Sequence, residues 1–440
     1  MSATVPASEL KWHVEELARA AKAASRTLAT LSSEHKNQVL EAIAQALEKN
    51  AKPILAANGD DVLDAKGLVE SGELSQALLK RLKLDEAKLA DMVRSVRAVA
   101  QLADPSGRIL DRTLLDEGLE LQKVSCPLGV LAVIFEARPD AVTQISALAL
   151  KSGNAVILKG GREVERTTEV LVDVMREALA SNGIPQNAIC AVYGREAVSA
   201  LLKLEEMIDL VIPRGSNALV QHVQRNTRIP VLGHADGVCH VYVDAAADEA
   251  MALKLVVDSK VQYPAVCNAL ETVLINQSIA TSFLPKLLER LGEKNVRVRG
   301  CARSQAIAPE IESVNGKWHM EYSDLIAAVR IVDNIDGAID HINCYGSHHT
   351  DAIITNDTAA AKRFLDEVDS ANVFHNASTR FSDGYRYGFG SEVGISTSKL
   401  HARGPVGLEG LVTYKYKLYG TGQTVEEYAS RRRKFLHESD

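Results

Sequence analysis

With 440 residues, the sequence is too long for one simple hydrophobic core, and its length predicts two or three domains. Its 46% hydrophobic and 24% charged residues are ordinary for a soluble globular protein, and its formal net charge of −7 argues against a nucleic-acid partner. No stretch approaches the roughly 20 apolar residues of a membrane span, and the N-terminus lacks the apolar core of a signal peptide. We therefore expect neither nucleic acid nor membrane as a partner.

The six cysteines are widely spaced and form no CxxC pair. This spacing favours free thiols over a zinc site or a redox motif. Because free thiols persist in reducing compartments, the sequence predicts a cytoplasmic protein without a metal site.

The first hundred residues have the apolar spacing of helices, which we expect over 9–104. The next segment, "RILDRTLLDEGLELQKV", predicts two strands that fold over Asp116-Glu117-Gly118. Two interpretations of this charged hairpin stay open. It is an arm that pairs with another subunit, or it is a surface hairpin on its own domain.

From residue 129 onward, short apolar runs alternate with helical segments. The runs are "GVLAVIFE", "AVILKG", "AICAVYG" and "DLVIP", and "PVLGHADGVCHVYVD" is expected to add two further strands. This alternation predicts a parallel sheet flanked by helices, with ligands at the carboxyl ends of its strands. A second α/β region is expected over 247–400, and a last strand, "LVTYKYKLYG", is expected to pair with the hairpin.

Two strand-to-helix turns are candidates for binding phosphate, although the chain lacks GxGxxG after its first strand. They follow "AVILKG" and "DLVIP", and each could present backbone N–H groups at a helix start. Lys159 ends one strand, and Arg162 begins the following helix. This cation pair suits a monoester phosphate; the alternative is two solvated surface cations.

One cysteine has a context that suits catalysis. In "YPAVCNALETV", Pro264 fits the first turn of a helix, which would place Cys267 in that turn. There the helix dipole lowers the pKa of a thiol, and a thiolate attacks acyl carbons. A small buried core cysteine is the alternative, and spacing alone favours it.

Long segments of the chain carry a resemblance to a known family. The segments are "VIFEARPDAVTQISALALKSGNAVILKGG", "IPRGSNALV", "YPAVCNALETVLI", "GSHHTDAIIT", "FHNASTRFSDG" and "GFGSEVGISTSKLHARGPVGLEGL". They resemble the gamma-glutamyl phosphate reductases, also called glutamate-5-semialdehyde dehydrogenases, of the aldehyde dehydrogenase superfamily. The resemblance covers nearly the whole chain.

This resemblance implies an α/β fold with two Rossmann-like domains and a protruding β-hairpin oligomerisation arm. The implied division is an NADP(H)-binding domain over 1–107 and 127–244, a catalytic domain over 245–403, and an arm and tail over 108–126 and 404–440. It also implies a homo-oligomer, a dimer or larger, and makes a glutamate 5-kinase a candidate partner.

The implied reaction is the second step of proline biosynthesis from glutamate. L-glutamyl 5-phosphate is reduced with NADPH to L-glutamate 5-semialdehyde, and phosphate is released. The resemblance makes Cys267 the nucleophile that forms a thioester. Its backbone N–H and Asn268 are the candidate donors to the oxyanion, because the turn "FEARPDA" has no asparagine of the kind ordinary members use.

Further roles are implied by matching positions. Lys159 matches the lysine that holds the adenosine ribose, and Arg162 replaces a glutamate of NAD-preferring members, which favours NADP(H). Gly215 and Ser216 fall in the turn that faces the cofactor phosphates. Glu321 matches the glutamate on the nicotinamide ribose, and a surface carboxylate is its alternative.

The acceptor and the substrate pocket complete the expectations. Hydrolytic members carry a glutamate near position 231, where this chain has Val231, so phosphate rather than water is expected as the partner of the thioester. Arg380 could anchor the α-carboxylate of the substrate or form a structural ion pair. The candidate substrate residues are His349, Asn376, Ser378, Thr379, Arg380 and Arg403. Rival functions are an oxidising aldehyde dehydrogenase and a non-catalytic nucleotide-binding or scaffold protein.

Overall fold

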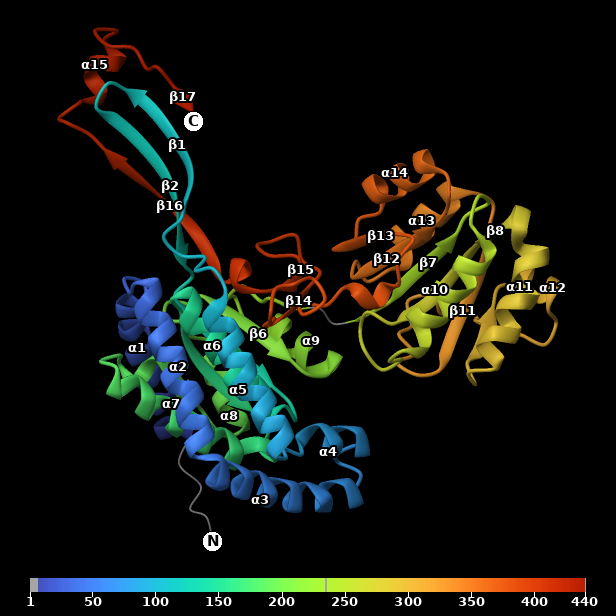
Figure 1. Ribbon diagram of the computed structural model, residues 1–440, viewed down its shortest axis with the longest axis horizontal. Helices are drawn as coiled ribbons and strands as arrows, with labels where there is room; N and C mark the ends of the chain where they lie inside the picture. Colours follow the sequence, from blue (N-terminus) through green and yellow to red (C-terminus); the bar gives the residue numbers. More distant parts are fainter. Residues whose placement is uncertain (1–6, 234–235, 440) are drawn as a thin grey trace. The chain divides into compact units, whose positions relative to one another are not determined.

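A computed structural model describes residues 7–233 and 236–439, and the chain divides into two units (Figure 1). The first unit contains residues 1–232, 389–394 and 406–440. The second contains residues 233–388 and 395–405. Among the described residues, no helix combines the length and apolar character needed to cross a bilayer.

The first unit is built on a parallel sheet in the strand order β5-β4-β3-β6. Its strands are β3 (Val130–Phe135), β4 (Ala155–Gly160), β5 (Ile189–Ala191) and β6 (Leu210–Arg214). The helices that connect and follow them are α6 (Pro139–Ser152), α7 (Glu165–Ser181), α8 (Arg195–Leu201) and α9 (Asn217–Asn226). β3 and β4 are buried along their whole length, which explains their continuous apolar sequence. The strand order reverses between β3 and β6, and such a switch point is where ligands bind in parallel sheets.

The sequence predicted helices over 9–104, and among the described residues five helices precede this sheet. They are α1 (Ala7–Leu28), α2 (Ser33–Lys49), α3 (Ala51–Glu70), α4 (Gln76–Leu82) and α5 (Glu86–Gln101). Side chains of Ser32, Ser75 and Asp85 accept N–H groups at the starts of α2, α4 and α5. The apolar face of α2 is turned into the core. Its residues Val39, Leu40, Ile43 and Leu47 are fully buried, as its amphipathic sequence pattern predicts.

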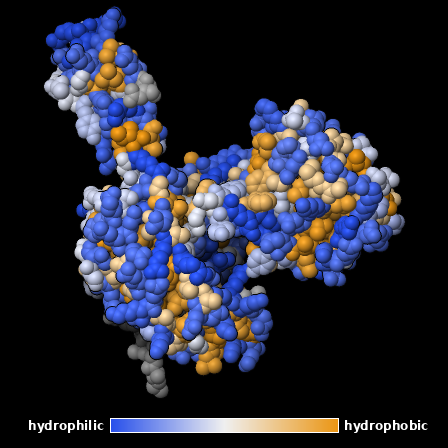
Figure 2. Space-filling view, viewed as in Figure 1, coloured by the Kyte–Doolittle hydropathy of each residue, from blue (hydrophilic) through white to orange (hydrophobic). Residues whose placement is uncertain are grey.

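An antiparallel sheet in the order β16-β2-β1-β17 forms the arm of the first unit. Its elements are β1 (Ile109–Asp116), β2 (Leu119–Pro127), β16 (Val412–Tyr419), α15 (Val425–Ala429) and β17 (Glu438–Ser439). The predicted hairpin and its pairing with the last long strand are confirmed, with Lys415 opposite Val124. Gly118 supplies the positive φ (69°) of the turn. Apolar side chains lie among hydrophilic ones on this arm (Figure 2).

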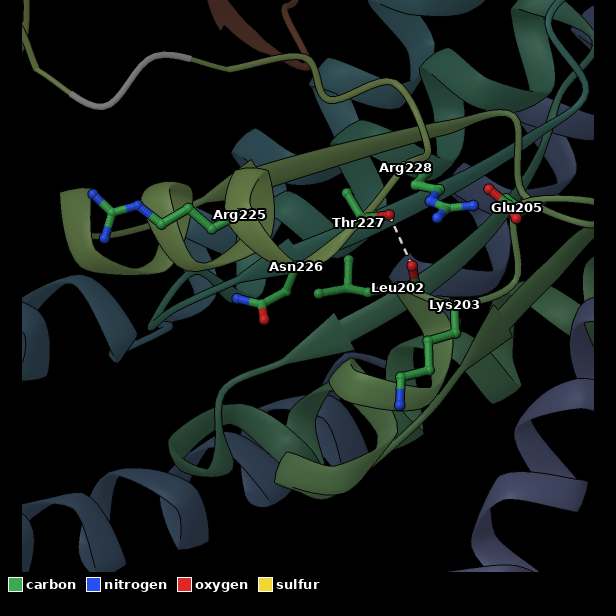
Figure 3. A pocket seen from close by; sticks show the side chains of 7 residues that line it. All are labelled: Leu202, Lys203, Glu205, Arg225, Asn226, Thr227 and Arg228. Carbon is green, nitrogen blue, oxygen red and sulfur yellow. Dashed lines mark hydrogen bonds between the residues drawn. The ribbon is translucent and has the colours of Figure 1, made fainter.

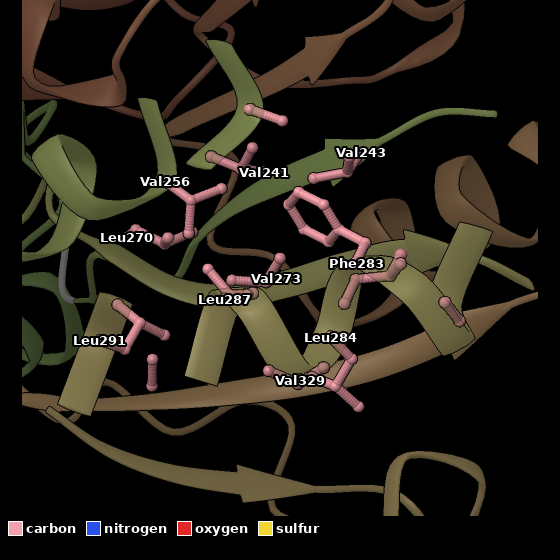
Figure 4. Packing of buried hydrophobic residues seen from close by; sticks show 14 of the residues in the cluster. Val241, Val243, Val256, Leu270, Val273, Phe283, Leu284, Leu287, Leu291 and Val329 are labelled. Carbon is pink, nitrogen blue, oxygen red and sulfur yellow. The ribbon is translucent and has the colours of Figure 1, made fainter. Parts of the chain in front are cut away.

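The second unit is also built on a parallel sheet, in the order β10-β9-β11-β8-β7-β12-β13. Its strands are β7 (Cys239–Val243), β8 (Leu270–Asn276), β9 (Arg297–Gly300), β10 (Glu312–Ser313), β11 (Ile326–Val332), β12 (Thr350–Ile354) and β13 (Asn372–His375). Its helices are α10 (Glu249–Val261), α11 (Gln277–Gly292), α12 (Ala302–Ile307), α13 (Ile335–Tyr345) and α14 (Thr358–Glu367). Phe283, Leu284 and Leu287 of α11 are buried in one cluster with Val241 and Val273 of the sheet (Figure 4). The short strands β14 (Gly394–Ser396) and β15 (Gly404–Val406) pair with each other.

One strand lies in a different sheet from the one expected. We expected "HVYV" to extend the first sheet, but β7 pairs with β8 and β12 in the second. Accordingly the units divide at 232/233, whereas the sequence placed a boundary at 244/245. Of the described residues in this segment, those around Val231 join the first sheet, through a bridge between Val231 and Val211. A buried apolar strand has no local signal for its partner, so pairing over long separations decided its sheet.

Candidate active site

Cys267 lies in a turn at the amino edge of the second sheet, three residues before β8. The predicted helix start at this position is wrong. The helix α10 ends at Val261, and Leu270–Asn276 is a fully buried central strand. The apolar residues after the cysteine therefore follow a strand rather than a helical face, and Cys267 does not lie in the first turn of a helix.

The main chain on both sides fixes Cys267. A Cβ atom at Gly237 would collide with the Cα and carbonyl of Cys267, so this close approach requires glycine. The thiol of Cys239 lies 3.2 Å from the Cys267 carbonyl oxygen and donates to it. Burial raises the pKa of Cys239 well above its ordinary value, so this thiol keeps its proton. The half-buried Cys267 side chain thus projects from a rigid backbone.

Glu321 is connected to the same backbone. Its Oε2 accepts the N–H of Gly237 at 3.0 Å. The residues after Glu321 are in turn held by Glu271, whose Oε1 accepts the Ser323 N–H at 3.3 Å. Glu271 forms a fully buried ion pair with Lys260, Nζ to Oε2 3.0 Å. A chain of contacts therefore leads from β8 through the Glu321 segment to the turn that carries Cys267.

Three predicted residues hold the turn from a second side. The Asn268 Nδ2 donates to the Ser382 carbonyl at 2.9 Å, and the Asn268 carbonyl accepts the Thr379 hydroxyl at 2.7 Å. The Thr379 N–H and the Ser378 hydroxyl both contact the hydroxyl of Ser259 in α10. These hydrogen bonds hold Asn268, Ser378 and Thr379 near the cysteine. Their polar groups are therefore already engaged in hydrogen bonds within the protein.

Arg380 brings positive charge to this side of the second unit. The residue is only 7% exposed, and its Nε donates to the Gln262 Oε1 at 2.9 Å. The pKa of Arg380 is lowered, chiefly because burial disfavours the charged form and also because the neighbouring Arg386 repels it, while Asp383 acts in the opposite direction. The preceding residue, Thr379, bonds the Asn268 carbonyl, which brings the segment of Arg380 to the turn of Cys267.

The other predicted substrate residues are more dispersed. His349 is fully buried at the start of β12, with Nδ1 2.8 Å from the Thr350 hydroxyl. Arg403 pairs with Asp369 at 2.9 Å. Asn376 follows β13 and spans both the N–H and the carbonyl of Thr355, which follows β12. Asn376 therefore lies at the carboxyl edge of the sheet, opposite the edge that carries Cys267.

The predicted cofactor residues other than Glu321, which belongs to the second unit, gather at the carboxyl edge of the first sheet. Lys159 is the penultimate residue of β4, is 8% exposed and donates to the Gly160 carbonyl at 2.6 Å. Arg162 begins a short helical turn before α7 and is exposed. Ser216 caps α9, with its hydroxyl accepting the Leu219 N–H at 3.4 Å. Two cations and a capped helix start at one sheet edge fit the phosphates of a nucleotide.

Two carboxylates at this edge were missed by the sequence analysis. Glu136, directly after β3, accepts the Ser216 N–H at 2.8 Å. Glu163 accepts the Ala137 N–H at 2.7 Å. The available signal was an acidic residue at the carboxyl end of a buried strand, a position from which a side chain reaches the neighbouring turns.

A cationic cavity of about 430 Å³ lies at the opposite, amino edge of the first sheet, where α8 and α9 end (Figure 3). Lys203, Arg225 and Arg228 line it together with Glu205. None of the predicted cofactor residues lines this cavity, so it is separate from the candidate nucleotide site. Across the described ranges, no group of three or more His, Cys, Asp or Glu side chains is placed to hold a metal ion.

Comparisons with known proteins agree with this architecture. The family model described as "Aldehyde dehydrogenase family" matches residues 1–328. A relative from Pelotomaculum thermopropionicum, named gamma-glutamyl phosphate reductase, is 51% identical over 96% of this chain and 97% of its own. One of the same name from Synechococcus elongatus is 54% identical over 96% and 98%. The chain belongs to the gamma-glutamyl phosphate reductases of the aldehyde dehydrogenase family.

Solved structures support the same conclusion. The crystal structure of a gamma-glutamyl phosphate reductase from Thermotoga maritima is 37% identical, covers 93% of this chain and 99% of its own, and superposes with a TM-score of 0.90. Glyceraldehyde-3-phosphate dehydrogenase from Methanocaldococcus jannaschii, solved with NADP, is 14% identical over 93% and 95%, with a TM-score of 0.64, and shares the fold. The expected α/β fold is confirmed, and family membership makes this chain an oxidoreductase with a nicotinamide cofactor.

Proposed function

We propose that this chain reduces L-glutamyl 5-phosphate with NADPH, giving L-glutamate 5-semialdehyde and phosphate. The nucleophile belongs to the second unit, and the residues assigned to the cofactor belong to the first, apart from Glu321 of the second unit. The observation that carries the proposal is the rigid turn of Cys267, fixed by Gly237 and Cys239 within reach of the buried Arg380 charge.

The reaction divides into two steps at one sulfur atom. The Cys267 thiolate attacks the acyl carbon, the carbon–oxygen bond to phosphate breaks, and a thioester remains. The bound nicotinamide supplies the hydride that reduces this thioester. As the aldehyde forms, the carbon–sulfur bond breaks and the thiolate is restored. The Cys267 N–H is the candidate donor to the developing oxyanion. The buried Asn268 amide, the other predicted donor, already donates to the Ser382 carbonyl, which favours a role in holding the turn.

The chain offers charge for an anionic substrate. Arg380 is buried and forms no ion pair with a described carboxylate, so its guanidinium can bind the carboxylate or phosphate of the substrate. Arg403 already pairs with Asp369, which favours a structural role. The fully buried His349 has its Nδ1 3.9 Å from the sulfur of Cys239, the residue that bonds the Cys267 carbonyl, which favours a role in supporting the turn over contact with substrate.

The cofactor is NADP(H) rather than NAD(H). The exposed Arg162, two residues beyond the end of β4, can pair with a 2′-phosphate. Lys159 is assigned to the adenosine ribose, Gly215 and Ser216 to the phosphates and Glu321 to the nicotinamide ribose. We also assign the protein to the cytoplasm, the arm to a homo-oligomeric contact and a glutamate 5-kinase to the supply of substrate.

The reverse reaction tests the proposal, because glutamate 5-semialdehyde is more stable than the acyl phosphate. Reduction of NADP should require inorganic phosphate and should vanish in Cys267→Ala. Cys344→Ala, which removes an exposed cysteine of the same unit, is the matched control and should keep full activity. Turnover that ignores phosphate would identify an oxidising dehydrogenase instead. Folded protein that binds NADP without turnover would point to a binding or scaffold role.

A further inference from the structure

At the switch point of the first sheet, the carboxylate of Glu136 lies where an anionic ligand could bind. The strand order reverses between β3 and β6, and the turns after these two strands carry Glu136 and Ser216. The Glu136 Oε2 accepts the Ser216 N–H at 2.8 Å, and its Oε1 lies 3.4 Å from the Ser216 hydroxyl. The carboxylate therefore bridges the crevice where a nucleotide would bind.

The geometry of the helix start favours this anion. Ser216 precedes α9, a helix of ten residues whose first turn contains no acidic residue. The first N–H groups of a helix lack intrahelical acceptors and carry partial positive charge, so a carboxylate there is stabilised. Gly215 leaves the necessary room, because a Cβ atom at this position would collide with the Glu136 carboxylate.

We propose that Glu136 competes with the cofactor for the start of α9, lowers the affinity for the nucleotide and accelerates its release. The inference rests on the proposed function, because it concerns the nucleotide site of that enzyme. A cofactor phosphate at the Ser216 N–H has to displace the carboxylate, since two anions cannot share one donor group without repulsion.

The backbone and side chain of Glu136 suit this exchange. Its N–H is bonded to the Arg214 carbonyl at 3.1 Å, which fixes the backbone between the two strands. The residue is only half-buried, so the carboxylate can rotate toward water. The carboxylate returns to the N–H group when the nucleotide leaves, and it satisfies that group in the free enzyme. Product release limits turnover in many enzymes, so a lower affinity for the nucleotide would speed its release and favour turnover.

Calorimetric titration of the protein with NADPH tests the inference. Glu136→Gln keeps the shape and removes the charge, and Glu136→Ala also removes the acceptor. Because a charge-assisted hydrogen bond no longer opposes binding, we expect the Kd for NADPH to fall roughly tenfold. Glu177→Gln, an exposed carboxylate near the far end of α7, makes the same charge change and should leave the Kd unaltered. An unchanged or higher Kd in both Glu136 variants would overturn the inference.

Inorganic pyrophosphate separates this inference from the proposed function. If the wild-type protein binds neither NADPH nor NADH, the proposed function fails, and the pyrophosphate titration then decides about Glu136. Tighter pyrophosphate binding by Glu136→Gln than by the wild type would support the inference about Glu136. Equal or undetectable affinity in both proteins would reject it.

Discussion

The main chains of Gly237 and Cys267 lie in direct contact, with no room for a side chain at position 237. The two residues precede β7 and β8, which are neighbours in the second sheet. The Gly237 N–H also donates to Glu321. A small residue between the two predicted functional residues therefore couples the nucleophile to the carboxylate assigned to the nicotinamide ribose.

Gly237→Ala tests this coupling. The added methyl group has to displace the turn of Cys267, and a misplacement of about 1 Å can lower a rate by roughly a hundredfold. We expect a loss of that order in kcat, together with slower alkylation of Cys267 by iodoacetamide in a Cys344→Ala background. Gly292→Ala, at an open position of the same unit, is the control. Full activity in Gly237→Ala would contradict the close approach.

Arg380 is predicted to stabilise the thiolate of Cys267. Removing its charge in Arg380→Gln should slow alkylation of Cys267 at neutral pH by about tenfold, because the nearby positive charge no longer favours the reactive thiolate. Arg380→Lys keeps the charge and should largely preserve the wild-type pH profile. The measurement is the rate of Cys267 alkylation against pH. Identical profiles for wild type and Arg380→Gln would show that Arg380 does not stabilise the thiolate.

Arg162 is predicted to set the cofactor preference. In Arg162→Glu, repulsion of the 2′-phosphate should raise the Kd for NADPH at least about tenfold, while the Kd for NADH stays similar or falls. Calorimetric titrations with both nucleotides make the comparison. Arg225→Glu, in the cationic cavity at the other edge of the sheet, controls for the change in net charge. Equal weakening of both nucleotides would exclude a 2′-phosphate contact.

The buried pair of Lys260 and Glu271 predicts a pH-dependent stability. Burial raises the pKa of Glu271 from its ordinary value of 4.5 to about 7. Between these pH values the folded state binds more protons at Glu271 than the unfolded state does. This carboxyl's contribution to stability is therefore complete below pH 4.5 and is lost as pH rises toward 7.

Urea unfolding of wild type and Glu271→Gln at several pH values measures this contribution. In a Trp12→Phe background, the fluorescence of the buried Trp318 reports on the second unit. The free energy of unfolding of the wild type, relative to Glu271→Gln, should decrease between pH 4.5 and 7. A constant difference over this range would show that Glu271 titrates as it does in the unfolded chain.

The arm is predicted to bind a second copy of the chain. Alternate residues of β16, Tyr414, Tyr416 and Leu418, are 49%, 61% and 58% exposed, and exposed apolar rows of this kind mark contact surfaces. Leu418→Asp combined with Tyr416→Asp should shift the oligomer toward monomer in sedimentation experiments. Lys417→Asp, one residue out of phase, should leave the assembly intact. A monomeric wild-type protein would contradict the arm's assignment.

By itself, the sequence determined the types of most elements and the family. Periodic apolar spacing indicated the N-terminal helices, continuous apolar runs indicated β3 and β4, and Gly118 marked the hairpin turn. These signals are local, because side chains a few residues apart decide whether a segment suits a helix or a strand. Long segments around Cys267, Arg162 and Ser216 carried the resemblance that identified the candidate residues.

Only the tertiary structure decided how these residues are held. It placed β7 in the second sheet and turned the expected helix at Cys267 into a turn before β8. It also joined Glu136 to Ser216, 80 residues apart in the sequence, and Lys260 to Glu271 in a buried pair. Strand pairing, burial and close backbone approach depend on partners distant in the chain. Local sequence does not encode such partners, and the folded structure selects them by the packing of the whole core.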